Sequence, residues 1–244
     1  MFIVIPTGHT QGIRNQPWVT VGILVSCTLI QLHVTFFAPG PAEYQRPLTI
    51  LYLIDRYDAN EPIPPNLAFI AIPKDPEERA QLRAQTELEL TRIQGRDLSV
   101  RLGHWYDEGL LSPKLLTSAF AHGGWLHLIG NMLFLYLCGC NLEDRWGRRA
   151  FAGFYLAAAL ISSAFPTLLH GGQHILALGA SGAIFGLLGA LGFLHWRHHE
   201  LLPLGFAQGK RWWWTILLVN AALPVLVRNV DWVAHLGGMV AGFA

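Results

Sequence analysis

Four polar side chains stand in apolar stretches of this sequence and have the types needed for nucleophilic chemistry: Ser181, His235, His127 and Asn131. A serine hydroxyl is a weak nucleophile until a base accepts its proton, and a neutral histidine is the usual base. We therefore take Ser181 as a candidate nucleophile and His235 as its candidate base. His127 and Asn131 are four residues apart, so a helix places them on one face. There they are candidate donors to the oxyanion of a tetrahedral intermediate.

The same residues also have structural interpretations, which the sequence alone leaves open. Ser181 is small enough to let two membrane helices approach closely, and Asn131 is a candidate for a hydrogen bond between helices. Asp231 lies one turn before His235 and is a candidate third member of a catalytic triad. Its position at the expected water boundary favours a different role for that carboxylate.

Glycines accompany both candidate catalytic residues. Gly182 and Gly186 form one GxxxG pair, and Gly238 and Gly242 form another. This spacing lets two helices pack backbone to backbone. If the two helices meet along these glycines, the hydroxyl of Ser181 comes within hydrogen-bond reach of the candidate base.

The elements that must position these residues are membrane helices. Of the 244 residues, 52% are hydrophobic and only 14% are charged, whereas soluble domains carry about 25% charged residues. Apolar runs of about 20 residues indicate spanning helices. Six are expected, at 17–38, 118–140, 150–169, 175–195, 212–228 and 230–244. The sequence thus predicts an all-α polytopic membrane protein, and its last helix, about 22 Å long, is expected to be truncated.

The distribution of charge predicts the orientation and the partners of the protein. Lys and Arg in short loops collect on the cytoplasmic side of a membrane. Seven lie in the loops on the side of the N-terminus, and one lies in the short loops on the other side. We therefore expect a multi-pass integral protein of a lipid bilayer with a cytoplasmic N-terminus. The net charge of +1 argues against a nucleic-acid partner, and the oligomeric state is left open.

The chain is expected to have three parts. These are residues 1–38 (the start and first span), 39–114 (a long outer loop) and 115–244 (the catalytic core, spans two to six). The loop opens with the Pro-rich stretch APGPAEYQRP, which we expect to be irregular. A surface helix is predicted in PEERAQLRAQTELELTRI, where Pro76 precedes acidic residues in the first turn. Trp105 and Tyr106 are expected to be interfacial aromatics.

Three motifs resemble the signatures of the rhomboid intramembrane serine proteases: HLIGN at 127–131, GASG at 179–182 and AHLGGMVAG at 234–242. The resemblance covers about 115–244 and implies a six-helix bundle that cleaves transmembrane protein substrates, without metal or cofactor. It also implies that Ser181 and His235 form a dyad. A bacterial cell membrane is the expected location.

Other positions acquire roles through the same resemblance. Phe185 matches an aromatic residue that packs against the catalytic histidine, and His122 matches a histidine with a structural or hydrogen-bonding role. Supporting glycines are Gly179, Gly182, Gly238 and Gly242. The chain departs from the family where many bacterial members carry Trp-Arg before the second span, because Pro113 and Lys114 stand there.

The sequence also bears on two other functions. A catalytically inactive rhomboid-like protein that binds and regulates membrane proteins is favoured by loss of Ser181 or His235, and both residues are present. A transporter predicts inverted repeats or charged residues near the midplane, and the sequence has neither. The motif HExxH of zinc proteases and the Gly-x-Gly-Asp motif of aspartyl intramembrane proteases are also absent from the sequence.

Overall fold

The structure is a computed structural model that describes residues 15–197, 218 and 231–243. The chain divides into two compact units. The first contains the residues up to Leu32 and those from Leu102 onward, and the second is His33–Arg101. The expected fifth span, 212–228, lies outside the described residues apart from Leu218.

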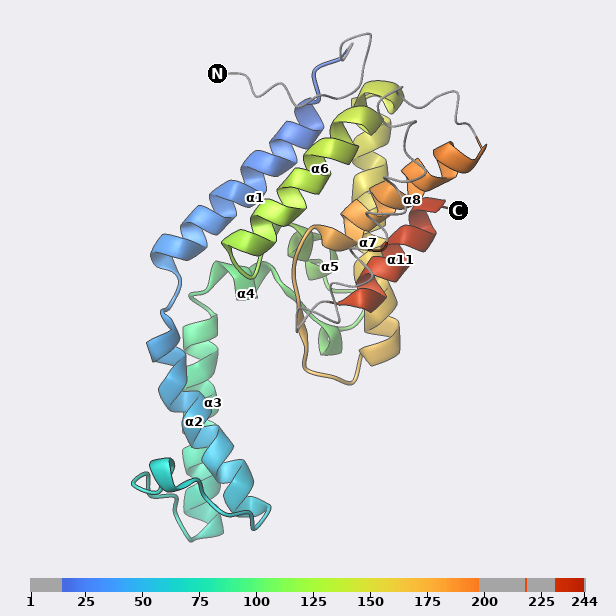
Figure 1. The fold of residues 1–244 in the computed structure, drawn as a ribbon. Coiled ribbons are helices and arrows are strands. Elements are labelled where there is room, and N and C mark those ends of the chain that lie inside the picture. The colour runs from blue at the N-terminus through green and yellow to red at the C-terminus, as the bar shows by residue number, and fades with distance from the viewer. Residues whose placement is uncertain (1–14, 198–217, 219–230, 244) are drawn as a thin grey trace. The chain divides into compact units, whose positions relative to one another are not determined.

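The first unit is a bundle of helices, as the sequence predicted (Figure 1). Its long elements are α1 (Trp18–Phe37, which continues into the second unit), α6 (Trp125–Trp146), α7 (Arg148–His170), α8 (Ser181–Arg197) and α11 (Trp232–Phe243). By length and composition α1, α6 and α7 can cross a membrane, and α8 and α11 are shorter apolar helices. The molecule is therefore a helical integral membrane protein.

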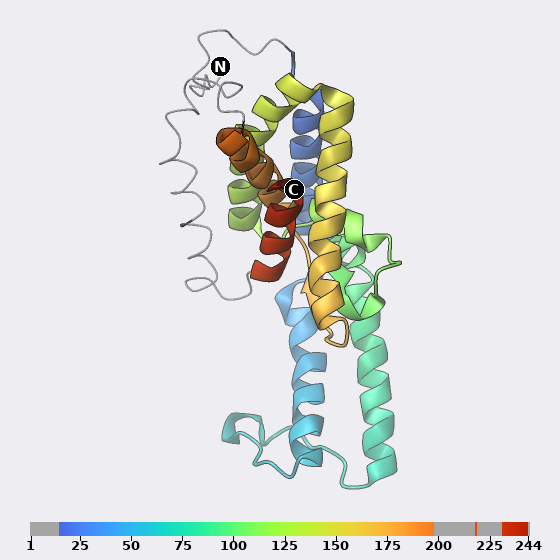
Figure 2. The same cartoon turned by 90° about the vertical axis from the view of Figure 1, so that its right-hand side faces the viewer.

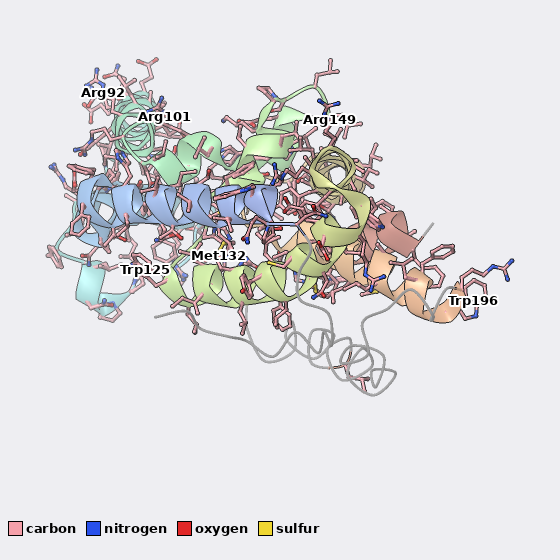
Figure 3. All side chains as sticks on the ribbon, turned by 90° about the horizontal axis from the view of Figure 1, so that it is seen from above. Arg92, Arg101, Trp125, Met132, Arg149 and Trp196 are labelled. Carbon is pink, nitrogen blue, oxygen red and sulfur yellow. The ribbon has the colours of Figure 1, made fainter. Side chains whose placement is uncertain are left out.

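Helix α8 packs against both α7 and α11 in this unit, and these two helices also contact each other (Figure 2). Its residues from Gly182 to Gly192 are buried, which is typical of a helix that is apolar on all sides. Along the neighbouring α6, Met132 is buried in the core whereas Trp125, at the start of the helix, is partly exposed (Figure 3). Helix α8, which begins at Ser181, thus forms the buried centre of this unit.

A buried carboxylate fixes the start of α1 against α6. Glu143 accepts hydrogen bonds from the backbone N–H of Val19 (2.9 Å) and Thr20 (2.8 Å), and from the hydroxyl of Thr20 (2.8 Å). The first N–H groups of a helix have no partner within the helix, and its dipole favours a negative charge there. Residues 142–147 (LEDRWG), which include Glu143, therefore have a structural role at the end of the bundle.

Short elements precede α6 in the chain and connect α7 to α8. They are α4 (Leu98–Leu102), β1 (His104–Trp105), η2 (Tyr106–Glu108), α5 (Lys114–Thr117), η3 (Ser118–Phe120) and β2 (Leu176–Ala177). The strands are antiparallel, with His104 opposite Ala177 and Trp105 opposite Leu176.

The predicted starts of two spans are wrong, and so is the end of the second span, because α6 continues to Trp146 and not to 140. The helix of the second span begins at Trp125 and not at 118, and that of the fourth begins at Ser181 and not at 175. Residues 118–120 form a 3₁₀ turn and 176–177 form a strand. Hydropathy does not distinguish these short apolar elements from the first turns of a helix.

The second unit pairs two helices. They are α2 (Pro41–Asp58) and α3 (Pro76–Gln94), and η1 (Pro65–Leu67) lies between them in the chain. Helix α3 confirms that this segment is helical, and its predicted place at the membrane surface stays a prediction. Pro76 stands at its start, and Asp75 caps it by accepting a hydrogen bond from Glu77 N–H at 3.3 Å.

Helix α2 corrects the prediction that the Pro-rich stretch is irregular. A proline in the first helical turn is tolerated because the N–H that it lacks has no helical partner there. Pro41 stands at this position. Glu43 reaches back to accept a hydrogen bond from Gly40 N–H at 3.2 Å, which completes the start of the helix. The proline content of this stretch therefore led to a wrong prediction, because the stretch contains the capped start of a helix.

Candidate active site

Ser181 and His235 meet at the N-terminal ends of two helices. Ser181 is the first residue of α8, and His235 lies in the first turn of α11. The Oγ atom of Ser181 and the Nε2 atom of His235 are 2.9 Å apart, which is hydrogen-bond distance. The sequence separates these two residues by 54 positions, so only the packing of α8 on α11 brings them together.

Close contact of the two helix backbones creates this proximity. A Cβ atom on Gly238 would collide with the carbonyl oxygen of Gly182, and one on Gly242 would collide with that of Gly186. A Cβ atom on Gly186 would lie 2.6 Å from Cβ of Ala158 in α7 and 3.4 Å from the carbonyl oxygen of Gly238. The predicted packing along the two GxxxG pairs is therefore confirmed, and it leaves no room for larger residues.

An aromatic ring packs against the imidazole of His235. The rings of Phe185 and His235 are stacked, with centroids 4.3 Å apart and planes inclined by 10°. Phe185 stands one turn after Ser181 on α8, so one helix supplies both the hydroxyl and the surface on which the imidazole lies. This contact limits rotation of the histidine ring.

His127 and Asn131 lie in the first two turns of α6, next to the segment that leads into α8. A Cβ atom on Gly179 would lie 2.8 Å from Cε1 of His127 and 3.6 Å from Nδ2 of Asn131. The φ angle of Gly179 is +124°, a conformation that L side chains rarely adopt. A glycine at 179 therefore satisfies both the backbone angle and the close approach of the two polar side chains.

The hydrogen bonds of these two side chains indicate which atoms can donate. His127 Nδ1 accepts a hydrogen bond from Gly123 N–H at 3.4 Å. In a neutral ring this leaves Nε2 as the N–H donor. Asn131 Nδ2 is buried and has no hydrogen-bond partner among the described residues. Both side chains thus carry a donor beside the Gly179 backbone.

Two bonds hold the segment before Ser181 in place. Gly179 N–H donates to the carbonyl oxygen of Ser118 at 2.9 Å, and Ala180 N–H donates to Nε2 of His122 at 3.5 Å. His122 is buried, with 2% of its surface exposed. Sequence analysis missed Ser118, because a backbone carbonyl leaves no signature in residue type.

Asp231 has partners other than the histidine ring. Its Oδ1 accepts hydrogen bonds from Val233 N–H (3.1 Å) and Ala234 N–H (3.0 Å), so it caps the start of α11. Its Oδ2 accepts a hydrogen bond from the hydroxyl of Tyr106. Both oxygens are thus engaged away from His235, and the triad interpretation of Asp231 has no support in these contacts.

The prediction that Tyr106 is an interfacial aromatic residue is wrong. Only 3% of its surface is exposed, and its hydroxyl bonds to Asp231. Burial and this hydrogen bond raise the pKa of Tyr106 well above its usual value, so the hydroxyl stays protonated and donates. Its position next to Trp105 suggested a membrane boundary, and only the fold reveals its partner.

Lys114, which stands where the sequence departs from the family pattern, forms an ion pair. Lys114 Nζ lies 2.5 Å from Oε1 of Glu108, and the hydroxyl of Thr117 donates to the carbonyl oxygen of Leu102 at 2.8 Å. Lys114 therefore ties α5 to η2. An ion pair occupies the place where many bacterial members carry Trp-Arg.

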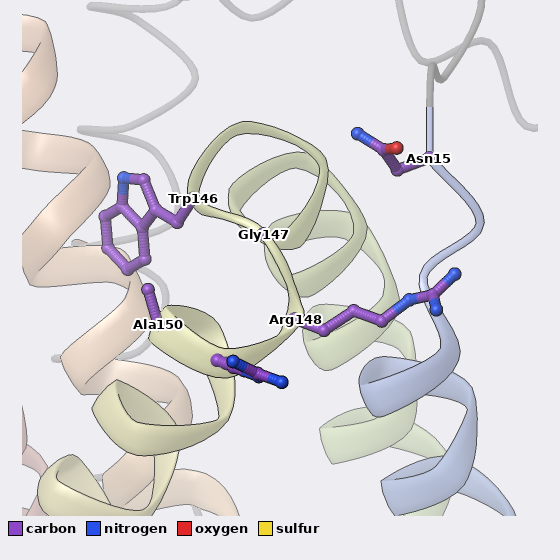
Figure 4. Close-up of a pocket in the computed structure, with 6 residues that line it drawn as sticks. Asn15, Trp146, Gly147, Arg148 and Ala150 are labelled. Carbon is purple, nitrogen blue, oxygen red and sulfur yellow. The ribbon is translucent and has the colours of Figure 1, made fainter.

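The candidate site has no group of metal ligands among the described residues, and the pocket found in the structure lies away from it. Among the described residues, no group of three or more His, Cys, Asp or Glu side chains is placed to hold a metal ion. A pocket of about 480 Å³ is lined by Asn15, Trp146 and the first residues of α7 (Figure 4). Trp146 ends the helix on which His127 stands in the first turn, so the two lie roughly 30 Å apart along its axis. This pocket is separate from the candidate site.

Fold and site together define a helical membrane protein with a serine–histidine pair at one end of its bundle. Comparison with known proteins agrees with that class. Residues 111–244 match the model of the Rhomboid domain, which is more than half of the chain. The chain therefore belongs to the rhomboid family.

Several known proteins are similar to this chain over the same region. RHOMBOID-like protein 5 of Arabidopsis thaliana is 33% identical over 138 residues, 53% of this chain and 41% of the relative. RHOMBOID-like protein 2 of the same plant is 36% identical over 138 residues, 53% of this chain and 40% of the relative. Rhomboid protease GluP of Bacillus subtilis (strain 168) is 30% identical over 141 residues, 58% of this chain and 25% of the relative. The chain thus spans less than half the length of each of these relatives.

Proposed function

We propose that this protein is an intramembrane serine endopeptidase in which Ser181 is the nucleophile and His235 is the general base. The observation that carries the proposal is the 2.9 Å separation of Ser181 Oγ and His235 Nε2. A hydroxyl becomes an effective nucleophile when a base contacts its proton directly. The similarity to a relative that is named a rhomboid protease adds support. The proposed catalytic core is 115–244.

In the proposed reaction, Ser181 Oγ attacks the scissile carbonyl carbon while its proton passes to His235 Nε2. The C–N bond of the tetrahedral intermediate then breaks, and the imidazolium gives the proton to the leaving amine. Water next loses a proton to His235 and attacks the acyl-serine. The ester bond breaks, and Ser181 regains its proton.

The negative oxygen of the intermediate needs donors that are in position before it forms. We assign this role to Nε2 of His127 and Nδ2 of Asn131, which both lie beside Gly179. The first N–H groups of α8, which begins at Ser181, add the positive end of a helix dipole. Loss of one donor of this kind typically lowers the rate by about 10²–10³-fold.

The supporting residues fix the geometry of this site. We assign to Phe185 the orientation of the imidazole, in place of a third catalytic acid. His122 and Gly179 hold and shape the segment before the nucleophile. Gly182, Gly238 and Gly242 keep α8 and α11 in contact.

We propose transmembrane proteins as substrates and the bilayer as the site of the reaction. Cleavage near a locally unwound part of a substrate helix is expected, because a regular helix hides its carbonyl groups in hydrogen bonds. The excess of Lys and Arg in loops on the side of the N-terminus supports a cytoplasmic N-terminus. A bacterial cell membrane stays a prediction.

The test is cleavage of a purified single-span substrate in lipid vesicles by the parent chain, Ser181→Ala and His235→Ala. We expect the parent to cleave and both variants to lose activity by about 10³-fold or more, with unchanged helix content. Phe185→Leu is an intermediate variant, expected to retain part of the activity. Equal cleavage by all variants would exclude the dyad, and an inactive parent that still captures membrane proteins would favour a binding function.

A further inference from the structure

We propose that Tyr106 and Asp231 form a positioning pair for His235, and that the segment His104–Glu108 fixes both helices of the site. The inference rests on the proposed function, because it concerns the geometry of that dyad. We name the segment His104–Glu108 the tie segment. It consists of β1 and η2, and it lies outside the three sequence motifs of the site.

The first connection of the tie segment runs to the helix of the base. The Tyr106 hydroxyl donates to Oδ2 of Asp231, while Oδ1 of the same carboxylate caps the first turn of α11. The carbonyl oxygen of Asp231 also accepts the hydrogen bond of His235 N–H, at 3.2 Å. One residue thus joins the tyrosine, the helix start and the backbone of the proposed base.

The second connection runs to the segment that leads into the nucleophile. The rings of Trp105 and His174 are stacked, with centroids 4.0 Å apart and planes inclined by 10°. Asp107 Oδ2 lies 2.8 Å from Nδ1 of the same histidine. Tyr106 N–H donates to the carbonyl oxygen of Ile175 at 3.1 Å. Three consecutive residues therefore hold the stretch that continues through β2 to Ser181.

The third connection anchors the tie segment to α7. His104 is fully buried, and its Nε2 lies 3.0 Å from the hydroxyl oxygen of Thr167. Tyr106 packs near the end of the same helix, with its ring 6.4 Å from that of His170. The tie segment is thus fixed to a long helix on one side and to both site helices on the other.

This arrangement makes Tyr106 a positioning residue. The helix packing sets the distance between α8 and α11, whereas the cap sets the position of the first turn on which His235 stands. A reacting group displaced by about 1 Å can cost 10²-fold in rate. Without the Tyr106 hydroxyl, the carboxylate of Asp231 loses one of its hydrogen bonds, and the first turn of α11 opens more often.

The test compares Tyr106→Phe, Asp231→Asn and their double variant with the parent, using Tyr155→Phe as a matched control. Tyr155 is also buried, and its hydroxyl has no hydrogen-bond partner among the described residues. Three quantities are measured: kcat and KM on a single-span substrate, the rate at which a fluorophosphonate labels Ser181, and amide hydrogen exchange at 232–235.

We expect Tyr106→Phe to lower kcat and the labelling rate by about tenfold or more, with KM changed less than twofold. Amide exchange in the first turn of α11 should accelerate by about tenfold, which corresponds to loss of one charged hydrogen bond. The effects of the two single variants should be less than additive, because they remove the same contact. Tyr155→Phe should leave all three quantities unchanged.

Three results would overturn the inference. These are unchanged exchange and labelling in Tyr106→Phe, an equal effect of Tyr155→Phe, and additive effects of Tyr106→Phe and Asp231→Asn. A parent that neither cleaves nor labels would instead contradict the proposed function. In that case amide exchange still decides whether Tyr106 and Asp231 hold the start of α11, so the two failures are distinguishable.

Discussion

Two helix pairs in this molecule are held together in opposite ways. In α8 and α11, backbones meet directly, and a Cβ atom on Gly238 would collide with the carbonyl oxygen of Gly182. In α2 and α3, long charged side chains connect the helices: Arg83 lies 2.5 Å from Oδ1 of Asp55, and Arg79 lies 2.6 Å from Oδ1 of Asp58.

The difference shows where precision is required. Arginine side chains reach their partners from many backbone positions, so the α2–α3 pair tolerates small shifts. A glycine contact has no adjustable side chain, and a displacement of α11 moves His235 directly. The site is therefore expected to be sensitive to single methyl groups, and the α2–α3 pair is expected to tolerate loss of whole ion pairs.

The largest effect is expected for Gly238→Ala. The added methyl group has no space against Gly182, so α11 must move away from α8. Overpacking of a core typically costs about 1–3 kcal/mol, sometimes more, and we expect about 3 kcal/mol here. The denaturant midpoint of purified protein measures this loss, and substrate cleavage should fall by at least 10²-fold.

Gly153→Ala is the matched control for this prediction. Gly153 lies in α7, is exposed and has nothing within 4 Å of its added Cβ. The substitution should be neutral or stabilise the helix by up to about 1 kcal/mol. Equal losses in the two variants would mean that the α8–α11 contact is not specially constrained.

The second prediction concerns the buried carboxylate that fixes α1. Glu143→Ala leaves the N–H groups of Val19 and Thr20 without their acceptor, and an unsatisfied buried donor costs about 1–3 kcal/mol. We expect a loss of about 2 kcal/mol in the free energy of unfolding. Asp144→Ala removes only the exposed hydrogen bond that Asp144 Oδ1 accepts from Asn15 N–H and should cost less than half as much. A larger loss in Asp144→Ala would contradict the assignment.

The comparison also explains which parts of the fold could be predicted. The four candidate residues and both glycine pairs depend on helical periodicity and residue type, which a sequence displays directly. His127 and Asn131 share a helix face because they are four positions apart. The meeting of α8 and α11 followed from the spacing of small residues.

The remainder depends on contacts that no local pattern encodes. Ser118 contributes a carbonyl oxygen, so any residue type could have stood there. Tyr106 and Asp231 are 125 positions apart, and neither shows its partner by type or spacing. Helix α2 was missed because prolines suggest irregular chain unless the first turn and its capping glutamate, Glu43, are recognised together.

The third prediction is a pH effect on the ion pair between η2 and α5. Burial tends to raise the pKa of Glu108, but hydrogen bonds from Lys114 and Ser112 outweigh it, so the pKa lies below its usual value. A carboxyl group of this kind stabilises the fold above its unfolded pKa, and the contribution disappears as the pH falls through the folded pKa. The free energies of unfolding of the parent and Glu108→Gln should differ by about 1 kcal/mol at pH 7 and converge once the pH falls below the lowered pKa of Glu108. A difference that persists in acid would exclude the ion pair as its source.

The smallest effect is expected for Arg83→Met, which removes the ion pairs with Asp55 and Asp58 from the α2–α3 pair. Exposed ion pairs contribute about 0.2–1 kcal/mol each and are screened by salt, so we expect less than 1 kcal/mol in low salt and less still in high salt. Leu53→Ala is the control for sensitivity, because that fully buried side chain should cost about 2–5 kcal/mol. The rate at which a protease cleaves within residues 41–94 of each full-length variant measures both losses of stability. If Arg83→Met opened the pair as much as Leu53→Ala, ion pairs would constrain α2 and α3 as strictly as glycines constrain α8 and α11.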